Sequence, residues 1–117
     1  MTAANFILKT TMGERGPVTV AVTGEVDATN AAKFTAAVEE IAAGQAAVLD
    51  LSALLYLDSA GFAALHRILA RHTVAVALSP HSPLRRAAAL MGLPNHDTVE
   101  EAASALSQGS RGGRQRH

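Results

Sequence analysis

An apolar run ends and a helical pattern begins within residues 57–65, whose sequence is LDSAGFAAL. The chain is mostly apolar over Ala46–Leu57, and after Ser59 large apolar residues recur at the spacing of one helix face. Asp58 and Ser59 therefore stand at the boundary between a strand and a helix. A carboxylate and a hydroxyl at such a boundary either cap the helix or take part in the chemistry of the protein.

The region before this boundary predicts two strands and a helix. Residues 5–12 and 18–23 have β-like patterns, and the turn residues 13–17 between them favour a hairpin of antiparallel strands. After Asp27 the apolar spacing becomes helical in an alanine-rich segment, and this helix ends near Gly44.

The rest of the chain alternates strands and helices. Residues 46–51 predict a short central strand, residues 74–78 a fourth strand, residues 82–92 a short helix, and the capping box at 98–101 begins a last helix. With the helix after Ser59, this order predicts an α/β fold: one domain with a mixed sheet of four to five strands and about four helices that mainly cover one face.

Composition limits the classes of function. The chain has 117 residues, enough for one domain, and ten basic and ten acidic side chains give a net charge of zero. This balance gives no global attraction to nucleic acid. The sequence has no cysteine, so disulfides and cysteine-based zinc sites are excluded.

The two ends of the chain predict its location and its domain limits. The first residues lack the basic segment and long apolar run of a signal peptide, and the apolar runs are too short to span a membrane, so we expect a cytoplasmic protein without membrane insertion. Residues 1–108 form the expected domain. Residues 109–117 are rich in Gly and Arg with no apolar residue, which predicts a disordered basic tail.

Enzyme chemistry finds little support in the sequence. A nucleophile elbow requires Gly-x-Ser-x-Gly, and Leu57 replaces the first glycine before Ser59. His66 lies seven residues further on, about 10 Å along a helix, which is too far for direct proton transfer. The histidines show no metal-binding pair with a carboxylate, and both common glycine-rich nucleotide motifs are lacking. We therefore expect neither a catalytic residue nor a cofactor.

Three segments together resemble a known family. The segments are VTGEVDATNAAKF (residues 22–34), VLDLSALLYLDSAGFAALHRIL (residues 48–69) and LSPHSPLRRAAALMGLP (residues 78–94). In this order and spacing they resemble the STAS domain of bacterial anti-sigma factor antagonists. The resemblance covers about Phe6 to Leu106, nearly the whole chain.

The resemblance implies a phosphorylation site and a binding surface. In the family, an anti-sigma factor that is itself a serine kinase phosphorylates the serine of an Asp-Ser-x-Gly motif, and this position falls on Ser59. Many members have a second serine after it, where this chain has Ala60. The loop after residue 26 and the helix after Ser59 correspond to the partner-binding surface, and the implied residues are Asp27, Asn30, Asp58, Ala60, Gly61, Phe62 and His66.

The function implied by the resemblance is regulatory and non-catalytic. The unphosphorylated protein would bind the anti-sigma factor serine kinase and free a sigma factor, phosphorylation of Ser59 would end binding, and a serine phosphatase would reset the cycle. Direct nucleic-acid binding is not expected, and the oligomeric state stays open. Two alternatives remain: a STAS subunit bound to the ATPase of an ABC-type transporter, and a hydrolase that uses Ser59.

Overall fold

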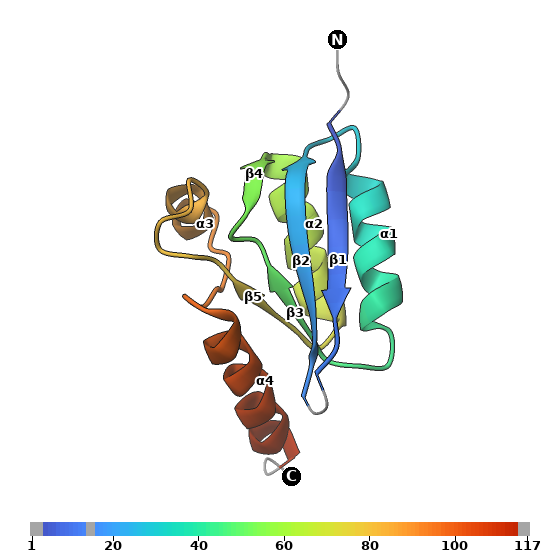
Figure 1. Ribbon diagram of the computed structural model, residues 1–117, viewed down its shortest axis with the longest axis vertical. Helices are drawn as coiled ribbons and strands as arrows, with labels where there is room; N and C mark the ends of the chain where they lie inside the picture. Colours follow the sequence, from blue (N-terminus) through green and yellow to red (C-terminus); the bar gives the residue numbers. More distant parts are fainter. Residues whose placement is uncertain (1–3, 14–15, 115–117) are drawn as a thin grey trace.

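The computed structural model describes residues 4–13 and 16–114, with side chains as far as residue 108. Over these residues the chain forms one sheet of five strands and four helices (Figure 1). In chain order they are β1 (Phe6–Thr11), β2 (Val18–Val26), α1 (Ala31–Ala42), β3 (Ala47–Asp50), β4 (Leu54–Leu57), α2 (Ser59–Arg71), β5 (Val74–Ala77), α3 (Arg85–Leu90) and α4 (Val99–Arg114). The predicted α/β domain with a mixed sheet and about four helices is confirmed.

The sheet has the order β1-β2-β3-β5, and β1 pairs antiparallel with β2 as the hairpin pattern predicts. The pairs β2–β3 and β3–β5 are parallel. Strand β4 also pairs parallel with β2. Because β3 pairs with residues 18–21 of β2 and β4 with residues 24–26, the two strands lie end to end along one edge of β2.

The sequence pattern did not distinguish strand β4 from the apolar run that begins with β3. Strand β4 has only four residues, LLYL, and follows β3 after an interruption of three residues, 51–53. Leu54 and Leu57 are buried, whereas Leu55 and Tyr56 are exposed, so the segment lacks the strict alternation of a half-buried strand. A register shift between Gly24 and Glu25 of β2 accounts for this pattern, because it places an extra residue in β4.

The larger core lies between the sheet and α1, α2 and α3. Phe34 of α1 and Leu65 and Ile68 of α2 are fully buried in it, beside Val20 of β2. The ring of Phe34 meets that of Phe6 edge to face, with centroids 5.5 Å apart. Burying one side chain of this size stabilises a fold by about 1.5–3 kcal/mol. This core fixes the position of α2, the helix that begins at Ser59.

Helix α4 packs on the opposite face of the sheet, against β3 and β5 (Figure 1). Its Ala102 is buried in a second cluster with Val48, Ala75 and Ala77. Three helices therefore share the larger core, and α4 covers part of the other face. Among the described residues, no helix is long and apolar enough to cross a membrane.

The end of α4 overlaps the tail expected at 109–117, because this helix runs to Arg114. Residues 115–117 lie outside the described residues, as do the side chains from residue 109 onward. The disorder of the tail therefore stays a prediction.

Candidate functional site

Asp58 and Ser59 have different roles at the start of α2. Asp58 is the N-cap residue, with extended φ and ψ of −97° and −172°, and its carboxylate accepts a hydrogen bond from the Gly61 backbone N–H at 3.1 Å. Ser59 is the first helical residue and is exposed. Among the described residues, its hydroxyl has no hydrogen-bond partner. Capping therefore accounts for Asp58 and leaves the Ser59 hydroxyl free.

The junction of β4 and α2 is fixed by close packing. Leu57 pairs with Val26 of β2, and the Asp58 backbone N–H donates to the Val26 carbonyl at 3.3 Å. Gly61 is buried against this pair: a Cβ added to Gly61 would collide with the Leu57 side chain and lie 3.2 Å from the Val26 carbonyl oxygen. A side chain at position 61 would force the buried Leu57 side chain to move.

A loop of residues 27–30 follows β2 at the end of the sheet where α2 begins. We call it the acidic loop after its one acidic residue, Asp27. Parallel strands β2 and β4 end side by side at Val26 and Leu57, so the acidic loop and the start of α2 are neighbours. The Asp27 carboxylate accepts hydrogen bonds from the backbone N–H of Thr29, at 2.8 Å, and from its hydroxyl. The hydroxyl bond is the main cause that lowers the pKa of Asp27 below its usual value. Asp27 is therefore ionised at neutral pH.

Asn30 lies within the acidic loop, but its side chain is only 6% exposed. Its amide oxygen accepts from the Asp27 backbone N–H at 2.9 Å, and its amide nitrogen donates to the carbonyls of Ala4 and Glu25, both at 3.0 Å. This side chain holds the acidic loop together, and its role as a partner contact stays a prediction.

The helix α2 presents a clear outer face. Residues Ser59, Ala63, His66, Arg67 and Ala70 are exposed, at positions that share one side of a helix. The ring of His66 forms a hydrogen bond with the Met91 carbonyl, with Nε2 3.0 Å from the oxygen.

The residues that the resemblance implied are thus only partly at the surface. Gly61 and Phe62 are buried and Ala60 is half-buried, whereas His66 lies on the outer face. Ala63 and Arg67 lie four and eight residues after Ser59 on this exposed face, and the resemblance did not imply them.

The opposite end of the sheet holds a polar contact between α1 and α2. The Glu39 carboxylate lies 3.0 Å from Nε2 of His72 and 3.7 Å from Nε of Arg71. The hydrogen bond to His72 is the main cause that lowers the pKa of Glu39. The two helices are therefore joined at their ends by a carboxylate that is ionised at neutral pH.

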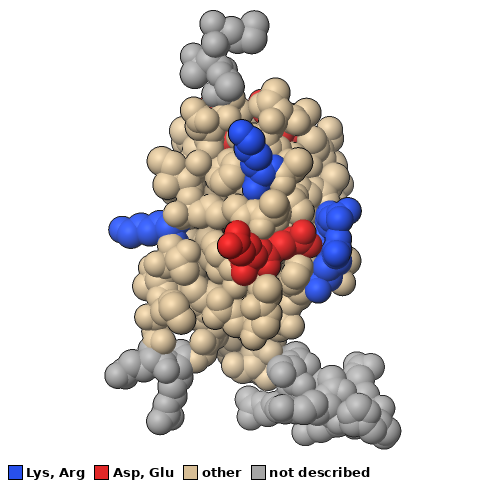
Figure 2. Space-filling view, turned by 90° about the vertical axis from the view of Figure 1, so that its right-hand side faces the viewer, with Lys and Arg blue, Asp and Glu red and all other residues tan. Residues whose placement is uncertain are grey.

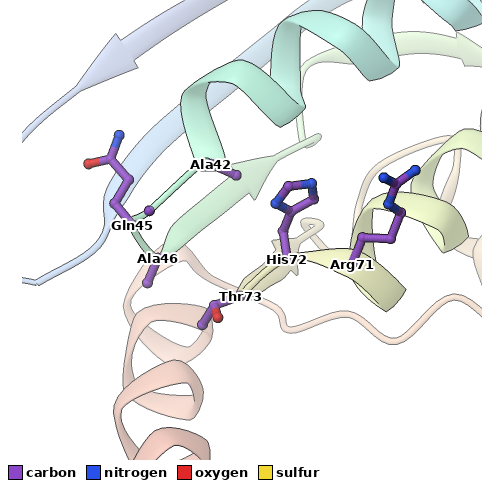
Figure 3. Close-up of a pocket in the computed structure, with 7 residues that line it drawn as sticks. Ala42, Gln45, Ala46, Arg71, His72 and Thr73 are labelled. Atoms are coloured by element: carbon purple, nitrogen blue, oxygen red, sulfur yellow. The ribbon is translucent and has the colours of Figure 1, made fainter.

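A pocket of about 400 Å³ lies beside this contact (Figure 3). In Figure 3, Arg71 and His72 project from the end of α2 on one side of it. It is lined by Ala42, Gly44, Gln45, Ala46, Arg71, His72 and Thr73. Strands β3 and β5 begin here, whereas Ser59 follows the end of β4, so this pocket is not part of the Ser59 site.

Charged groups are sparse on the side of the molecule where α1 lies. Figure 2 shows one small acidic group there, with separate basic side chains around it and a mostly uncharged surface. That face has no basic patch of the kind that binds nucleic-acid phosphates. Within residues 4–13 and 16–114, the acidic and histidine side chains form no cluster that could hold a metal ion.

Comparison with known families identifies this architecture. The family model described as "Mlab, STAS domain" matches residues 10–101. The chain belongs to the STAS domain family. Among curated proteins, the comparison finds no match.

Solved structures of STAS proteins agree with this assignment. An anti-sigma factor antagonist from Mycobacterium paratuberculosis is 26% identical with a TM-score of 0.75, and the match covers 88% of this chain and 95% of that one. The anti-sigma factor antagonist SpoIIAA in its unphosphorylated form is 19% identical with a TM-score of 0.62, over 88% of this chain and 97% of the other, and shows the fold alone. The resemblance noted in the sequence is confirmed for both family and fold.

Proposed function

We propose that this STAS domain is an anti-sigma factor antagonist that binds an anti-sigma factor serine kinase while Ser59 is unphosphorylated. Binding frees a sigma factor, and phosphorylation of Ser59 by the bound kinase releases the complex. The protein itself acts by binding and not by catalysis. The observation that carries this proposal is the exposed Ser59 hydroxyl at the start of α2, next to an acidic loop and without a hydrogen-bond partner among the described residues.

The charges around Ser59 give the switch its physical basis. A phosphoryl group adds about −1.5 to −2 charges at neutral pH, and the N-terminus of a helix tolerates an anion. The fold therefore survives phosphorylation. Asp58 and the ionised Asp27 repel the added charge, however, and a docked partner would have to desolvate it. Several kcal/mol of lost binding are expected, and each 1.4 kcal/mol is about a tenfold loss of affinity.

The first test combines the protein, the candidate kinase and ATP, and maps the phosphate. We expect incorporation on Ser59 and none in Ser59→Ala. Ser104→Ala is the matched control, because Ser104 is an exposed serine on α4, far along the chain from the site. Incorporation that persists at the same rate in Ser59→Ala would refute the assignment.

The second test measures affinity for the kinase. Ser59→Ala should keep the wild-type dissociation constant, whereas Ser59→Asp should weaken binding at least tenfold through repulsion by Asp27 and Asp58. The free energy of unfolding of both variants should lie within about 0.5 kcal/mol of the wild-type value, since Ser59 is exposed. Equal affinity of the two variants would contradict a charge-operated switch.

The proposed cycle takes place in the bacterial cytoplasm and is reset by a serine phosphatase. The phosphate ester on Ser59 stands at an exposed position, where such an enzyme can reach it. Phosphorylated protein incubated with the phosphatase should regain the affinity of the unmodified chain for the kinase. Removal of the phosphate without recovery of kinase binding would contradict this step.

A second candidate function is a permanent STAS subunit on the ATPase of an ABC-type transporter. The observation that favours it is the outer face of α2, where the small uncharged side chains of Ala63 and Ala70 stand beside Arg67 and allow close contact. Co-purification separates the two functions: a small kinase supports the antagonist, and an ATP-binding cassette subunit supports the alternative. A hydrolase would be labelled at Ser59 by a serine-reactive probe, and we expect no labelling.

A further inference from the structure

We propose that Asn30 and the segment Ala4–Asn5 position the acidic loop for recognition by the kinase. We call Ala4–Asn5 the N-terminal strap. This inference rests on the proposed function and extends the site to residues that precede β1. Asn30 acts as a positioning residue, because its buried side chain reaches the partner only through the loop that it holds.

Hydrogen bonds connect the strap to the acidic loop. The Asn30 amide nitrogen donates to the Ala4 carbonyl at 3.0 Å, and the Glu25 backbone N–H donates to the Asn5 carbonyl at 2.8 Å. The same Asn30 side chain accepts from the Asp27 backbone N–H at 2.9 Å. One side chain thus joins the strap to Asp27, which follows the end of β2 beside the end of β4.

The close approach of the strap to β2 depends on Gly24. Its φ is +96°, a conformation that favours glycine, and a Cβ there would collide with the Asn5 carbonyl oxygen. Gly24 also pairs with Phe6, the first residue of β1. The strap therefore continues β1 past its paired region and passes alongside the acidic loop.

A pocket of about 340 Å³ lies between the strap and the start of α1, lined by Ala4, Asn5, Phe6, Thr29, Asn30 and Lys33. Beside this pocket, the hydrogen bonds of the Asn30 side chain connect the loop to the strap. The loop and the Ser59 site are joined by a short path, because the Val26 carbonyl next to Asp27 accepts a hydrogen bond from the Asp58 N–H.

The experiment compares the wild type, Asn30→Ala and a variant in which residues 1–5 are deleted. Asn95→Ala is the matched control, since the Asn95 amide donates to the Leu93 carbonyl at 2.8 Å in the loop after α3. Four quantities are measured: the hydrogen-exchange rate of the Asp27 N–H, the dissociation constant for the kinase, and kcat and KM for phosphorylation of Ser59.

In both test variants we expect Asp27 N–H exchange about tenfold faster and kinase binding about tenfold weaker. The KM for Ser59 phosphorylation should rise with kcat unchanged, because the hydroxyl itself is intact. Amides of the central strand β3 should keep their wild-type protection, which separates loop positioning from loss of the fold. Asn95→Ala should leave the Asp27 exchange rate and the kinase affinity unaltered.

Wild-type exchange of the Asp27 N–H in both variants would overturn the inference. So would faster exchange with unchanged affinity and KM, since the loop position would then not matter for recognition. If Asn30→Ala fails to fold, the deletion variant decides alone, because it keeps the Asn30 bonds to Asp27 and Glu25. If the wild type does not bind the kinase, both the proposed function and the recognition role of the strap are refuted.

Discussion

Asp58 and Gly61 are joined by a hydrogen bond of 3.1 Å, in which the Gly61 backbone N–H donates to the Asp58 carboxylate. This bond closes the first turn of α2 around Ser59 without using the Ser59 hydroxyl. The two adjacent polar residues at the boundary of β4 and α2 thus have separate roles: one stabilises the helix, and the other stays available for modification.

Loss of the cap should destabilise the protein measurably. Asp58→Ala removes the acceptor for an otherwise unpaired N–H of α2, so we expect the free energy of unfolding to fall by about 1 kcal/mol. Urea denaturation followed by circular dichroism measures this change. Asp58→Ser is the control, because serine also caps helices and should restore most of the loss. Equal stability of the alanine and wild-type chains would show that the cap contributes nothing.

Substitution of Gly61 by alanine should lower the free energy of unfolding, although it adds only one methyl group. In Gly61→Ala the added methyl group meets the Leu57 side chain and the Val26 carbonyl, and overpacking of this kind costs about 1–3 kcal/mol. Thermal and urea unfolding measure the cost. Ala63→Ser, on the exposed side of the same helix, should change stability by no more than about 0.5 kcal/mol. A stabilised Gly61→Ala variant would contradict the packing described for this junction.

The pKa of Asp27 should respond to Thr29. Thr29→Ala removes the hydroxyl that is the main cause of the lowered value, so the Asp27 pKa should rise towards its ordinary value of 3.8. Carbon-detected NMR titration of the Asp27 carboxyl group reports it directly. Thr10→Ala, an exposed change on β1, is the control and should leave that titration unchanged.

The same shift fixes the sign of one contribution to acid stability. Since the Asp27 pKa is lower in the folded chain than in the unfolded chain, ionised Asp27 favours folding above pH 3.8, and this contribution is lost as the pH falls through the folded pKa. The difference in stability between wild type and Thr29→Ala should therefore narrow on acidification. A stability difference that widens below pH 3.8 would contradict a lowered Asp27 pKa in the folded chain.

Glu39 should titrate according to its contact with His72. The hydrogen bond from His72 is the main cause of its lowered pKa, with Arg71 adding a smaller attraction, so His72→Ala should raise the Glu39 pKa towards 4.5. His81→Ala, an exposed change in the loop after β5, is the control and should leave the Glu39 pKa unchanged. In His72→Gln the amide can still donate to the carboxylate, so part of the shift should return. The NMR titration of Glu39 distinguishes these outcomes.

Local patterns in the sequence predicted most of the fold. The hairpin of β1 and β2 followed from residues 5–23, and α2 followed from the apolar spacing after Ser59, because both depend on contacts between near neighbours in the chain. Strand β4 was not separated from the preceding run, since its identity depends on the shifted register with β2. The position of α4 on the second face likewise depends on contacts of Ala102 with distant strands.

The site residues stay predictions, and the structure shows which of them are buried. Ser59 and Asp27 lie where the sequence indicated, at the ends of neighbouring parallel strands. Asn30 and Phe62 are buried, which a single sequence could not distinguish from exposure because a polar loop residue and an aromatic helix residue are each found in both states. Their roles as partner contacts stay predictions, and Asn30 is better explained by the strap that it holds.

The interruption between β3 and β4 separates the sheet into two halves along β2. The half formed with β3 and β5 is sandwiched between helices on both faces, whereas the half formed with β4 has only the single neighbour β2 and ends at Ser59. Leu54 and Leu57 of β4 lie in the core, whereas Leu55 and Tyr56 are exposed, so only the two exposed positions can change without repacking the core. Substitutions at Leu55 and Tyr56 would alter the surface of the strand that leads to Ser59 while leaving the fold constant.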